Sequence, residues 1–431
     1  MFHQLPLLNQ NSDGPQEFFT CKRSWSAAKH RIMLRYIQSH CYNLGGDKPF
    51  QSRHINYVDG FAGAGKYDDG FGIEDFVEKS NFWKRYNIDL LDTDGSPLIA
   101  LKCAQVFRAE KRVNLRCFFA EAHKKTNKEL QANCLGIGNG VECKIYKPQR
   151  FDKTFPQIIE DLNEYPTIFF LDSFGVKGIN FEQIGMIGRY VSRFKGELFL
   201  LFHNSSVARH AGYLTQKSDN ERMKKIAGTY MQNLTKMLGP NSDEDWKPKW
   251  LELKDEPQQF ERWALDYFTQ RIANEGQFNG VASFDIKERY TDLRPMYSIV
   301  VGSNHPRKAC GEFLNDFFAD ENKLLFYEVD KSKKNRNFLQ QAWERQTQQR
   351  KSEIKPKIIQ LLKQRNQQWK KMDDVITDLI LTLGSQGYDL GYLKRSDYRT
   401  IMIELFTEGI IQTESLGKKR FPTLESKVKI V

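Results

Sequence analysis

The alternation of short apolar runs with longer helix-like stretches constrains the fold of this chain more than any other feature. Five apolar runs lie between residues 53 and 202, and helix-like stretches lie between them. The runs are Ile55–Val58, Leu115–Ala120, Val141–Tyr146, Thr167–Leu171 and Glu197–Phe202, and the stretches are Pro97–Lys111, Lys124–Cys134, Phe151–Asn163 and Phe181–Phe194. Alternation of this kind predicts an α/β fold with a mostly parallel sheet and helices on both faces.

Further segments extend this pattern on either side. Trp25–Tyr42 is predicted to be an amphipathic helix, because its apolar residues recur at helical spacing. Val281–Glu288 and Met296–Val301 are strand-like and close in sequence, so we expect an antiparallel pair at the edge of the sheet. Lys66–Asp94 interrupts the pattern as an insertion after the first strand. Ser205–Gly276 is a helical insertion that either caps the substrate or elaborates the scaffold.

The composition changes after residue 330. Residues 331–352 are rich in Lys, Arg and Gln, which is typical of a solvated helical or flexible linker. Three helix-like stretches and two strand-like ones follow: Lys355–Arg365, Met372–Leu383, Arg395–Glu408, Gly409–Thr413 and Lys419–Thr423. This is the order of a winged helix. We therefore expect a Rossmann-like domain over 1–330, a basic linker over 331–352 and a small α+β winged-helix domain over 353–431.

The net charge of the 431-residue chain is +11, which favours an anionic partner, most often a nucleic acid. The seven cysteines show no ligand-like spacing and their number is odd, so we expect neither a metal site nor a disulfide framework. A reducing, cytoplasmic location follows from this. No run approaches the roughly 20 apolar residues that span a bilayer, and Met1–Gly14 is too polar for a signal peptide.

A glycine-rich sequence follows the first predicted strand. Residues 57–65 read Tyr-Val-Asp-Gly-Phe-Ala-Gly-Ala-Gly, and the glycines allow a sharp turn with close approach to a ligand. Open α/β sheets bind ligands at the carboxyl ends of their strands, where this turn would lie. A purely structural turn is the alternative interpretation. The residues expected to bind a cofactor here are Asp59, Gly60, Phe61, Gly63 and Gly65.

An acidic residue, Glu121, ends the second predicted strand. In nucleoside-binding doubly wound folds an acid at this position accepts hydrogen bonds from both ribose hydroxyls. The alternative is a surface glutamate that begins a helix. Together with the glycine-rich turn, Glu121 favours a nucleoside cofactor, which we expect to be S-adenosylmethionine.

A carboxylate and an aromatic residue follow the fourth predicted strand. Asp172 and Phe174 resemble the Asp or Asn and the aromatic ring that amino-methyltransferases carry there, although the prolines of that motif are missing. In those enzymes the polar group accepts a hydrogen bond from the target amine and the ring stacks on the base. We therefore expect Asp172 and Phe174 to be catalytic, with a structural cap as the alternative for Asp172. No Pro-Cys pair is present, which argues against cytosine C5 chemistry through a thiolate.

Three other polar segments are interpreted first as structural. Ser96 and Pro97 are expected to begin a helix, with Ser96 as its N-cap. His203, at the end of the fifth strand, more often satisfies backbone groups than contacts a substrate. His305 and Pro306 are expected to begin a helix.

Basic residues of the C-terminal domain lie where a winged helix contacts nucleic acid. We expect the third helix and the wing to bind phosphates through Lys394, Arg395, Arg399, Lys418, Lys419 and Arg420. A winged helix that binds protein is the alternative, because the excess of basic residues in this domain is moderate.

An ordered set of motifs resembles the three-Cys-motif partner (TcmP) family. The set spans roughly residues 25–318 and comprises Lys29-His30, Tyr36, residues 57–65, Gly95–Leu101, Asp172-Ser173-Phe174-Gly175 and His305-Pro306. The family has Asp-Pro-Phe-Gly where this chain has Asp-Ser-Phe-Gly. The resemblance implies a class I methyltransferase-like fold, sometimes followed by a winged helix. It also implies a partner protein with a three-cysteine, radical-SAM-like motif.

These observations favour an S-adenosylmethionine-dependent methyltransferase-like protein that acts on, or binds to, DNA or RNA. Catalysis would come mainly from orientation of the reactants, without a metal. The main alternative is a non-catalytic nucleic-acid-binding adaptor whose pocket is vestigial or senses a nucleotide. A nuclease or other hydrolase is a second alternative, and it would need its acids clustered on a metal.

Overall fold

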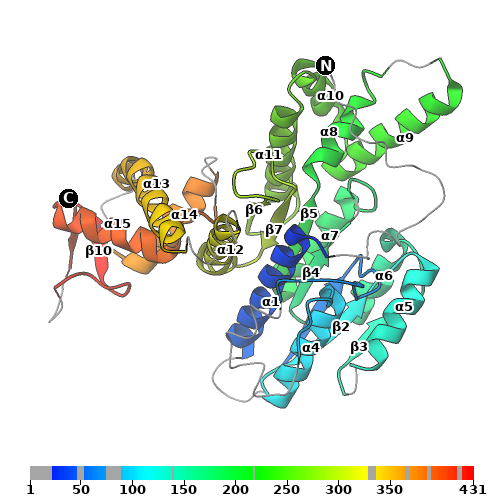
Figure 1. The fold of residues 1–431 in the computed structure, drawn as a ribbon, viewed down its shortest axis with the longest axis horizontal. Helices are drawn as coiled ribbons and strands as arrows, with labels where there is room; N and C mark the ends of the chain where they lie inside the picture. Colours follow the sequence, from blue (N-terminus) through cyan, green and yellow to red (C-terminus); the bar gives the residue numbers. More distant parts are fainter. Residues whose placement is uncertain are drawn as a thin grey trace. The chain divides into compact units, whose positions relative to one another are not determined.

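The computed structural model describes residues 22–45, 53–73, 89–137, 140–173, 175–216, 219–328, 336–364, 369–385, 390–414 and 420–431. The chain divides into two compact units, Met1–Tyr165 and Pro166–Val431 (Figure 1). Each unit is described below by itself. Predicted elements that fall on other residues, and Phe174, Lys418 and Lys419 among the predicted site residues, lie outside the described residues.

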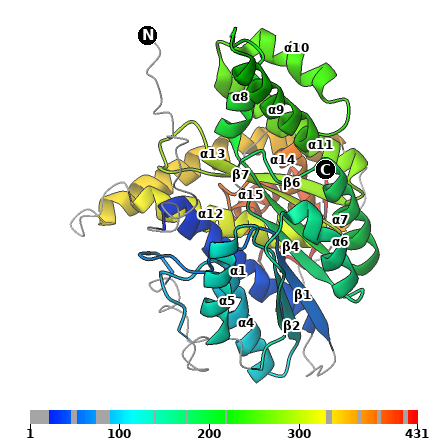
Figure 2. The same cartoon turned by 90° about the vertical axis from the view of Figure 1, so that its right-hand side faces the viewer.

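The first unit is built on three parallel strands. These are β1 (His54–Asp59), β2 (Asn114–Phe119) and β3 (Cys143–Ile145), and β2 lies between the other two. Its helices are α1 (Ser24–Gly45), α4 (Ser96–Ala109), α5 (Lys124–Leu135) and α6 (Phe151–Asp161). Helix α4 packs against β2 and contacts α1 and α5 (Figure 2). All residues of β1 and β2 except the first of each are buried, as expected for strands of a parallel sheet.

The second unit contains four strands of the same kind of sheet. Strand β4 (Thr167–Leu171) runs parallel to β5 (Gly196–Phe202), and α7 (Phe181–Phe194) connects them. Strand β7 (Tyr297–Ser303) is antiparallel to β5, and β6 (Gly280–Ile286) is antiparallel to β7. The antiparallel edge pair predicted from the sequence is therefore confirmed.

The seven strands have the order β3-β2-β1-β4-β5-β7-β6. The order of the first five strands is that of a doubly wound Rossmann sheet. The mostly parallel α/β fold is confirmed, and it is compatible with a Rossmann-like fold. Because apolar strands in such a sheet are buried on both faces, the sequence located all seven to within a few residues.

The described residues between 204 and 275 are mostly helical, as expected. Helices α8 (Asn204–Gly212), α9 (Glu221–Leu238), α10 (Asp243–Leu253) and α11 (Pro257–Glu275) contact one another, and α11 also packs on β6 (Figure 1). Their centre is aromatic, since Trp246, Phe260 and Phe268 are fully buried.

After β7 the chain forms a wide helical turn and then a long series of helices. The π-helix η2 (Arg307–Leu314) continues into α12 (Asn315–Tyr327), which confirms that His305-Pro306 precedes a helix. Helix α13 (Arg336–Gln364) covers much of the expected linker. It is not fully solvated, because the Trp343 ring lies 5.2 Å from Phe326 and 5.9 Å from Tyr290. No helix within the described ranges is both long and apolar enough to cross a membrane.

The C-terminal residues form a small helical core beside a three-stranded antiparallel sheet. Its elements are β8 (Lys370–Lys371), α14 (Met372–Ser385), α15 (Arg395–Thr407), β9 (Ile411–Thr413) and β10 (Lys427–Ile430). The strand order is β8-β10-β9. The expected strand at Lys419–Thr423 is wrong: its described residues 420–423 are not in a strand, and the strand lies at 427–430. The strand lies at 427–430 because Val428 packs into the hydrophobic core.

This C-terminal region is joined to α12 by buried hydrogen bonds. The side chain of Asn315 donates to the carbonyl of Leu393 (2.8 Å) and accepts from the amide of Gly391 (3.0 Å). Asn322 donates to the carbonyl of Gly391 (2.8 Å). Asn315 and Asn322 are seven residues apart and thus share one face of α12. Gly391 has a φ of +80°, and a Cβ there would lie 2.4 Å from that of Phe318, so only glycine fits.

Candidate functional site

The glycine-rich turn of the first unit adopts a backbone that glycine alone adopts without strain. Gly63 and Gly65 have φ values of +62° and +77°. A Cβ on Gly65 would lie 3.0 Å from a methyl group of Leu130. The carbonyl of Gly65 accepts from the amide of Gly95 (2.8 Å), which holds the turn against the start of α4. We refer to residues 59–65 as the bend.

Asp59 is fully buried at the end of β1 and anchors the bend. One carboxylate oxygen accepts from the amide of Phe61 (3.1 Å), and the other accepts from the hydroxyl of Ser96 (2.6 Å). The prediction that Ser96 is the N-cap of α4 is wrong, because Gly95 occupies that position without a side-chain cap. The Ser96 hydroxyl instead donates to Asp59, and the first turn of α4 thereby fixes the bend.

Glu121 and the bend lie together, as the sequence predicted. One oxygen of Glu121 accepts from the amide of Gly63 (3.0 Å), and the other accepts from the amide of His123 (2.7 Å). The side chain is half-buried. A carboxylate offers about four lone-pair positions, so each oxygen keeps one for another donor. Gly60 is buried, and the Phe61 ring lies 5.4 Å from that of Phe151.

A buried basic group beside the segment that follows the bend was missed by sequence reasoning. The Lys22 ammonium donates to the carbonyls of Asp94 (2.7 Å) and Asp92 (3.0 Å), and Asp94 also pairs with Lys102 (2.5 Å). Burial lowers the pKa of Lys22 to about 7. The contacts join residues about 70 positions apart, so no local spacing could have indicated them.

His30 on α1 lies near Lys22 and the segment that follows the bend. Its ring lies 6.0 Å from that of Tyr67, which follows the bend. Burial, followed by the charge of Lys22, holds the pKa of His30 well below its usual value. His30 is therefore neutral at physiological pH, and its Nδ1 has no hydrogen-bond partner among the described residues.

In the second unit, Asp172 follows β4 as predicted, and its side chain is half-buried. The loop after it is held close to α8. The Ser173 hydroxyl donates to the carbonyl of Gly175 (2.9 Å), and a Cβ on Gly175, whose φ is +76°, would lie 2.5 Å from the hydroxyl of Ser206. Phe174, the predicted aromatic partner of Asp172, lies outside the described residues.

A cavity of about 230 Å³ lies at the carboxyl ends of β5 and β6. Its polar wall includes Asn204 and Asp285, which are linked through the buried Ser298: Asn204 donates to its hydroxyl (3.2 Å), and that hydroxyl donates to Asp285 (2.5 Å). The buried carboxylate of Glu261 pairs with Arg294 (2.8 Å). Burial raises the pKa of Glu261 above its usual value, with Arg294 acting in the opposite direction.

The remaining lining residues of this cavity give it a mixed character. They are Leu265, Leu293, Pro295, Gln258, Arg262 and Lys287. Sequence reasoning considered His203 at this edge but missed its neighbour Asn204. The other lining residues lie more than 50 positions after Asn204 in the sequence, so no local pattern joined them to this edge.

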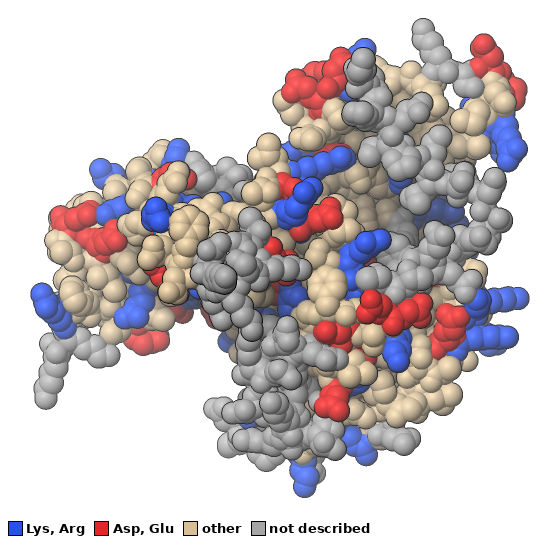
Figure 3. Space-filling view, in the orientation of Figure 1, with Lys and Arg blue, Asp and Glu red and all other residues tan. Residues whose placement is uncertain are grey.

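The basic residues predicted on the third helix are largely engaged within the protein. The guanidinium of Arg395 pairs with Asp373 and donates to the hydroxyl of Thr377 (2.6 Å), and Lys394 pairs with Asp320. Arg399 is exposed, and so is Arg420. Lysine and arginine side chains alternate with acidic ones over the described parts of the face in Figure 3.

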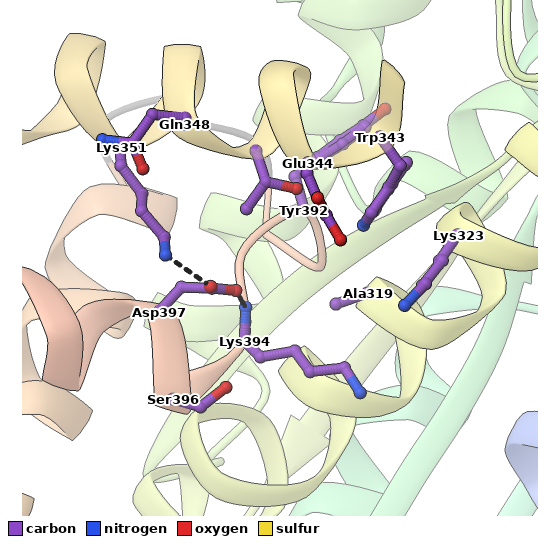
Figure 4. A pocket seen from close by; sticks show the side chains of 11 residues that line it. Ala319, Lys323, Trp343, Glu344, Gln348, Lys351, Tyr392, Lys394, Ser396 and Asp397 are labelled. Atoms are coloured by element: carbon purple, nitrogen blue, oxygen red, sulfur yellow. Dashed lines mark hydrogen bonds and ion pairs between the residues drawn. The ribbon is translucent and has the colours of Figure 1, made fainter. Parts of the chain in front are cut away.

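A second cavity, of about 400 Å³, lies between α12, α13 and the start of α15 (Figure 4). The Asp397 side chain lines this cavity and has two partners. Its carboxylate pairs with Lys351 (3.0 Å) and accepts from the backbone amide of Lys394 (2.9 Å). The carboxylate of Asp397 therefore accepts from the amide at the start of α15 and also neutralises the charge of Lys351.

No group of three or more potential metal ligands occurs among the residues that the structure describes. The carboxylates of Asp59 and Glu121 accept hydrogen bonds from backbone amides and a hydroxyl.

No protein-family model and no curated protein matches this sequence. Among solved structures, the protein LPL1258 from Legionella pneumophila str. Philadelphia 1, described under the family model DUF519, is 13% identical. The alignment covers 72% of this chain and 92% of that one, with a TM-score of 0.35. A similarity this weak carries no argument about function.

Proposed function

We propose that the first unit binds S-adenosylmethionine at the bend and that the protein is a methyltransferase acting on nucleic acid. The observation that carries this proposal is the contact between Glu121 and the amide of Gly63 (3.0 Å). It joins a glycine turn after one strand to an acid after the next strand, which is the arrangement that nucleoside-binding α/β sheets use.

The residues present fit an adenosyl group. Glu121 keeps one lone-pair position on each oxygen, which matches the two hydroxyl donors of a ribose. Gly63 and Gly65 have no side chains that would block close approach to the backbone. Asp59 would act indirectly by holding the bend, because it is fully buried. The cofactor would supply the methyl group, while this chain binds and orients it.

The cavity at the ends of β5 and β6 supports a nucleic-acid acceptor. Leu265, Leu293 and Pro295 offer apolar surface to a base, and Arg262 and Lys287 supply positive charge for phosphate. Asp172 follows the strand beside β5, and we propose it as the group that orients the acceptor amine.

We propose that the C-terminal region is a winged-helix module that recruits a partner. The order helix, strand, helix, helix, strand, strand and the three-stranded antiparallel sheet support this. Its partners would be nucleic acid and a protein with a three-cysteine, radical-SAM-like motif, as the TcmP resemblance implies. The six cysteines that the structure describes are free thiols. We propose a reducing, cytoplasmic location, where thiols stay reduced.

Isothermal titration calorimetry with S-adenosylmethionine tests the cofactor proposal. We expect binding to the wild-type protein and an affinity roughly 10- to 100-fold lower in Glu121→Gln, because the variant loses charge-assisted acceptors for the ribose. Glu129→Gln on α5 is the matched control and should bind like the wild type. Absence of S-adenosylmethionine binding to the folded wild-type protein would contradict the proposal. If that protein still bound oligonucleotides, the non-catalytic nucleic-acid-binding adaptor would be favoured.

A transfer assay with labelled methyl groups over DNA, RNA and protein tests the reaction. Asp172→Ala should abolish transfer and retain cofactor binding. An active Asp172→Ala protein would remove this residue from the catalytic set.

A further inference from the structure

One face of the C-terminal sheet carries a group of basic side chains that the fold leaves open to solvent. Side chains alternate between the two faces of a strand. Val428 of β10 and Ile411 of β9 are buried in the core, so their neighbours Lys427, Lys429 and Gln412 lie on the opposite face.

Strand β8 adds to this face. Lys371 is directly opposite Lys427 and is exposed. Trp369 immediately precedes β8, is 37% exposed, and its ring centre lies 4.9 Å from the ammonium of Lys429. We call these five residues the lysine face: Trp369, Lys371, Gln412, Lys427 and Lys429.

The charges of the lysine face are only loosely neutralised. Like charges directly opposite each other in a sheet are unfavourable, and Lys371 and Lys427 form such a pair. Glu425 pairs with Lys371 (2.7 Å) and Glu414 with Lys427 (3.2 Å), but all four side chains are more than half exposed. Exposed pairs of this kind contribute little to stability, so an anionic ligand can replace the glutamates. For Lys429, the described residues offer no carboxylate within ion-pair distance.

We propose that the lysine face binds single-stranded nucleic acid, with one base stacked on Trp369 and phosphates contacted by Lys371, Lys427 and Lys429. Lys427 and Lys429 are two residues apart on one strand, about 6.7 Å, which lets them contact successive phosphates of an extended strand. Aromatic side chains beside a basic track are the elements with which proteins bind unpaired strands. Gln412, opposite Lys429, adds a polar group beside the base.

The helix that usually reads duplex DNA in a winged helix is poorly suited to that task here. Arg395 is held by Asp373, and Lys394 by Asp320, which leaves Arg399 as the exposed basic residue of α15. The positive charge available to a ligand is therefore on the sheet. This inference extends the nucleic-acid part of the proposed function, but it does not require cofactor binding, so the two can fail separately.

Fluorescence anisotropy with a fluorescein-labelled 12-nucleotide oligothymidine and a 12-base-pair duplex tests the proposal over a series of KCl concentrations. The full-length protein should bind the single strand more tightly than the duplex. Loss of three phosphate contacts in K371Q/K427Q/K429Q should make the negative slope of log K against log salt shallower by about 2. The affinity at low salt should fall at least tenfold.

Variants of Trp369 separate stacking from charge. W369A should bind about 5- to 150-fold more weakly at every salt concentration with an unchanged slope, whereas W369F should retain most of the affinity. The matched control is K224Q/K247Q/K249Q on α9 and α10, which removes three lysines that also form ion pairs with nearby acidic residues. It should bind like the wild type.

Three results would overturn the proposal: no binding of the single strand at 50 mM KCl, equal or tighter binding of the duplex, or an equal loss in the control triple variant. Calorimetry with S-adenosylmethionine on K371Q/K427Q/K429Q distinguishes the two proposals. Retained cofactor binding with lost oligothymidine binding supports the lysine face. Loss of both would show that the triple variant is misfolded, and the oligothymidine affinities of W369A and W369F then decide.

Discussion

Replacing Asn315 by alanine removes the side chain that joins α12 to residues 390–394. Two groups lose their partner: the carbonyl of Leu393 (2.8 Å) and the amide of Gly391 (3.0 Å). Both residues are buried, and Asn315 itself is 1% exposed, so water does not replace the lost bonds. An unsatisfied buried group costs about 1–3 kcal/mol, which predicts a loss of about 2–6 kcal/mol from the free energy of unfolding.

Asn322→Ala gives a graded comparison. It removes a single hydrogen bond, to the carbonyl of Gly391 (2.8 Å), so the expected loss is about 1–3 kcal/mol. Asn274→Ala is the control, because Asn274 is exposed near the end of α11 and its replacement should change stability by about 0.5 kcal/mol or less.

Urea titration followed by tryptophan fluorescence measures these free energies. Hydrogen exchange on the same proteins should show faster exchange at residues 390–414 in Asn315→Ala than in the control. If Asn315→Ala and Asn274→Ala unfolded at the same urea concentration, the two hydrogen bonds of Asn315 would not contribute to the stability of the protein.

Three further predictions concern buried groups. Gly65→Ala should lower the free energy of unfolding in urea by about 1–3 kcal/mol, since it strains a positive φ and crowds Leu130; an unchanged midpoint would refute the geometry of the bend. Lys22 has a folded pKa of about 7, below its unfolded value, so wild-type stability should rise from about pH 7 to pH 10.5. Lys22→Met should lack this rise, which is at most about 1.4 kcal/mol per pH unit in urea titrations; an equal rise in both proteins would show that Lys22 is not buried. Burial lowers the pKa of His210 to about 4, so stability should fall as the pH drops from 6.5 towards 4, and His210→Gln should flatten that fall in thermal melts. A parallel fall in the variant would assign the acid sensitivity to other groups.

The sequence could predict what depends on short-range pattern. Apolar runs located the strands because buried strands need continuous apolar residues. The meeting of Glu121 and Gly63 was also predictable, since neighbouring parallel strands bring their carboxyl ends to one edge. Both inferences use only the order of elements and the direction of strands.

Contacts between distant polar residues could not be predicted in the same way. The bond from Ser96 to Asp59 and those from Lys22 to Asp92 and Asp94 have no periodic signature. A capping role was the better local interpretation of Ser96, and tertiary structure overrode it. The position of β10 was missed because strand-like sequence near residue 420 does not reveal which valine reaches the core.

The π-helix η2 determines which face of α12 is turned towards residues 390–394. An α-helix turns by about 100° per residue, so deleting one residue between 307 and 314 would rotate α12 by roughly that angle about its axis. Asn315 and Asn322 would then face away from residues 390–394, although every residue of the interface would still be present. A single extra residue in one helical turn therefore decides the orientation from which the C-terminal region is held, and insertions or deletions there should be tolerated far less than substitutions.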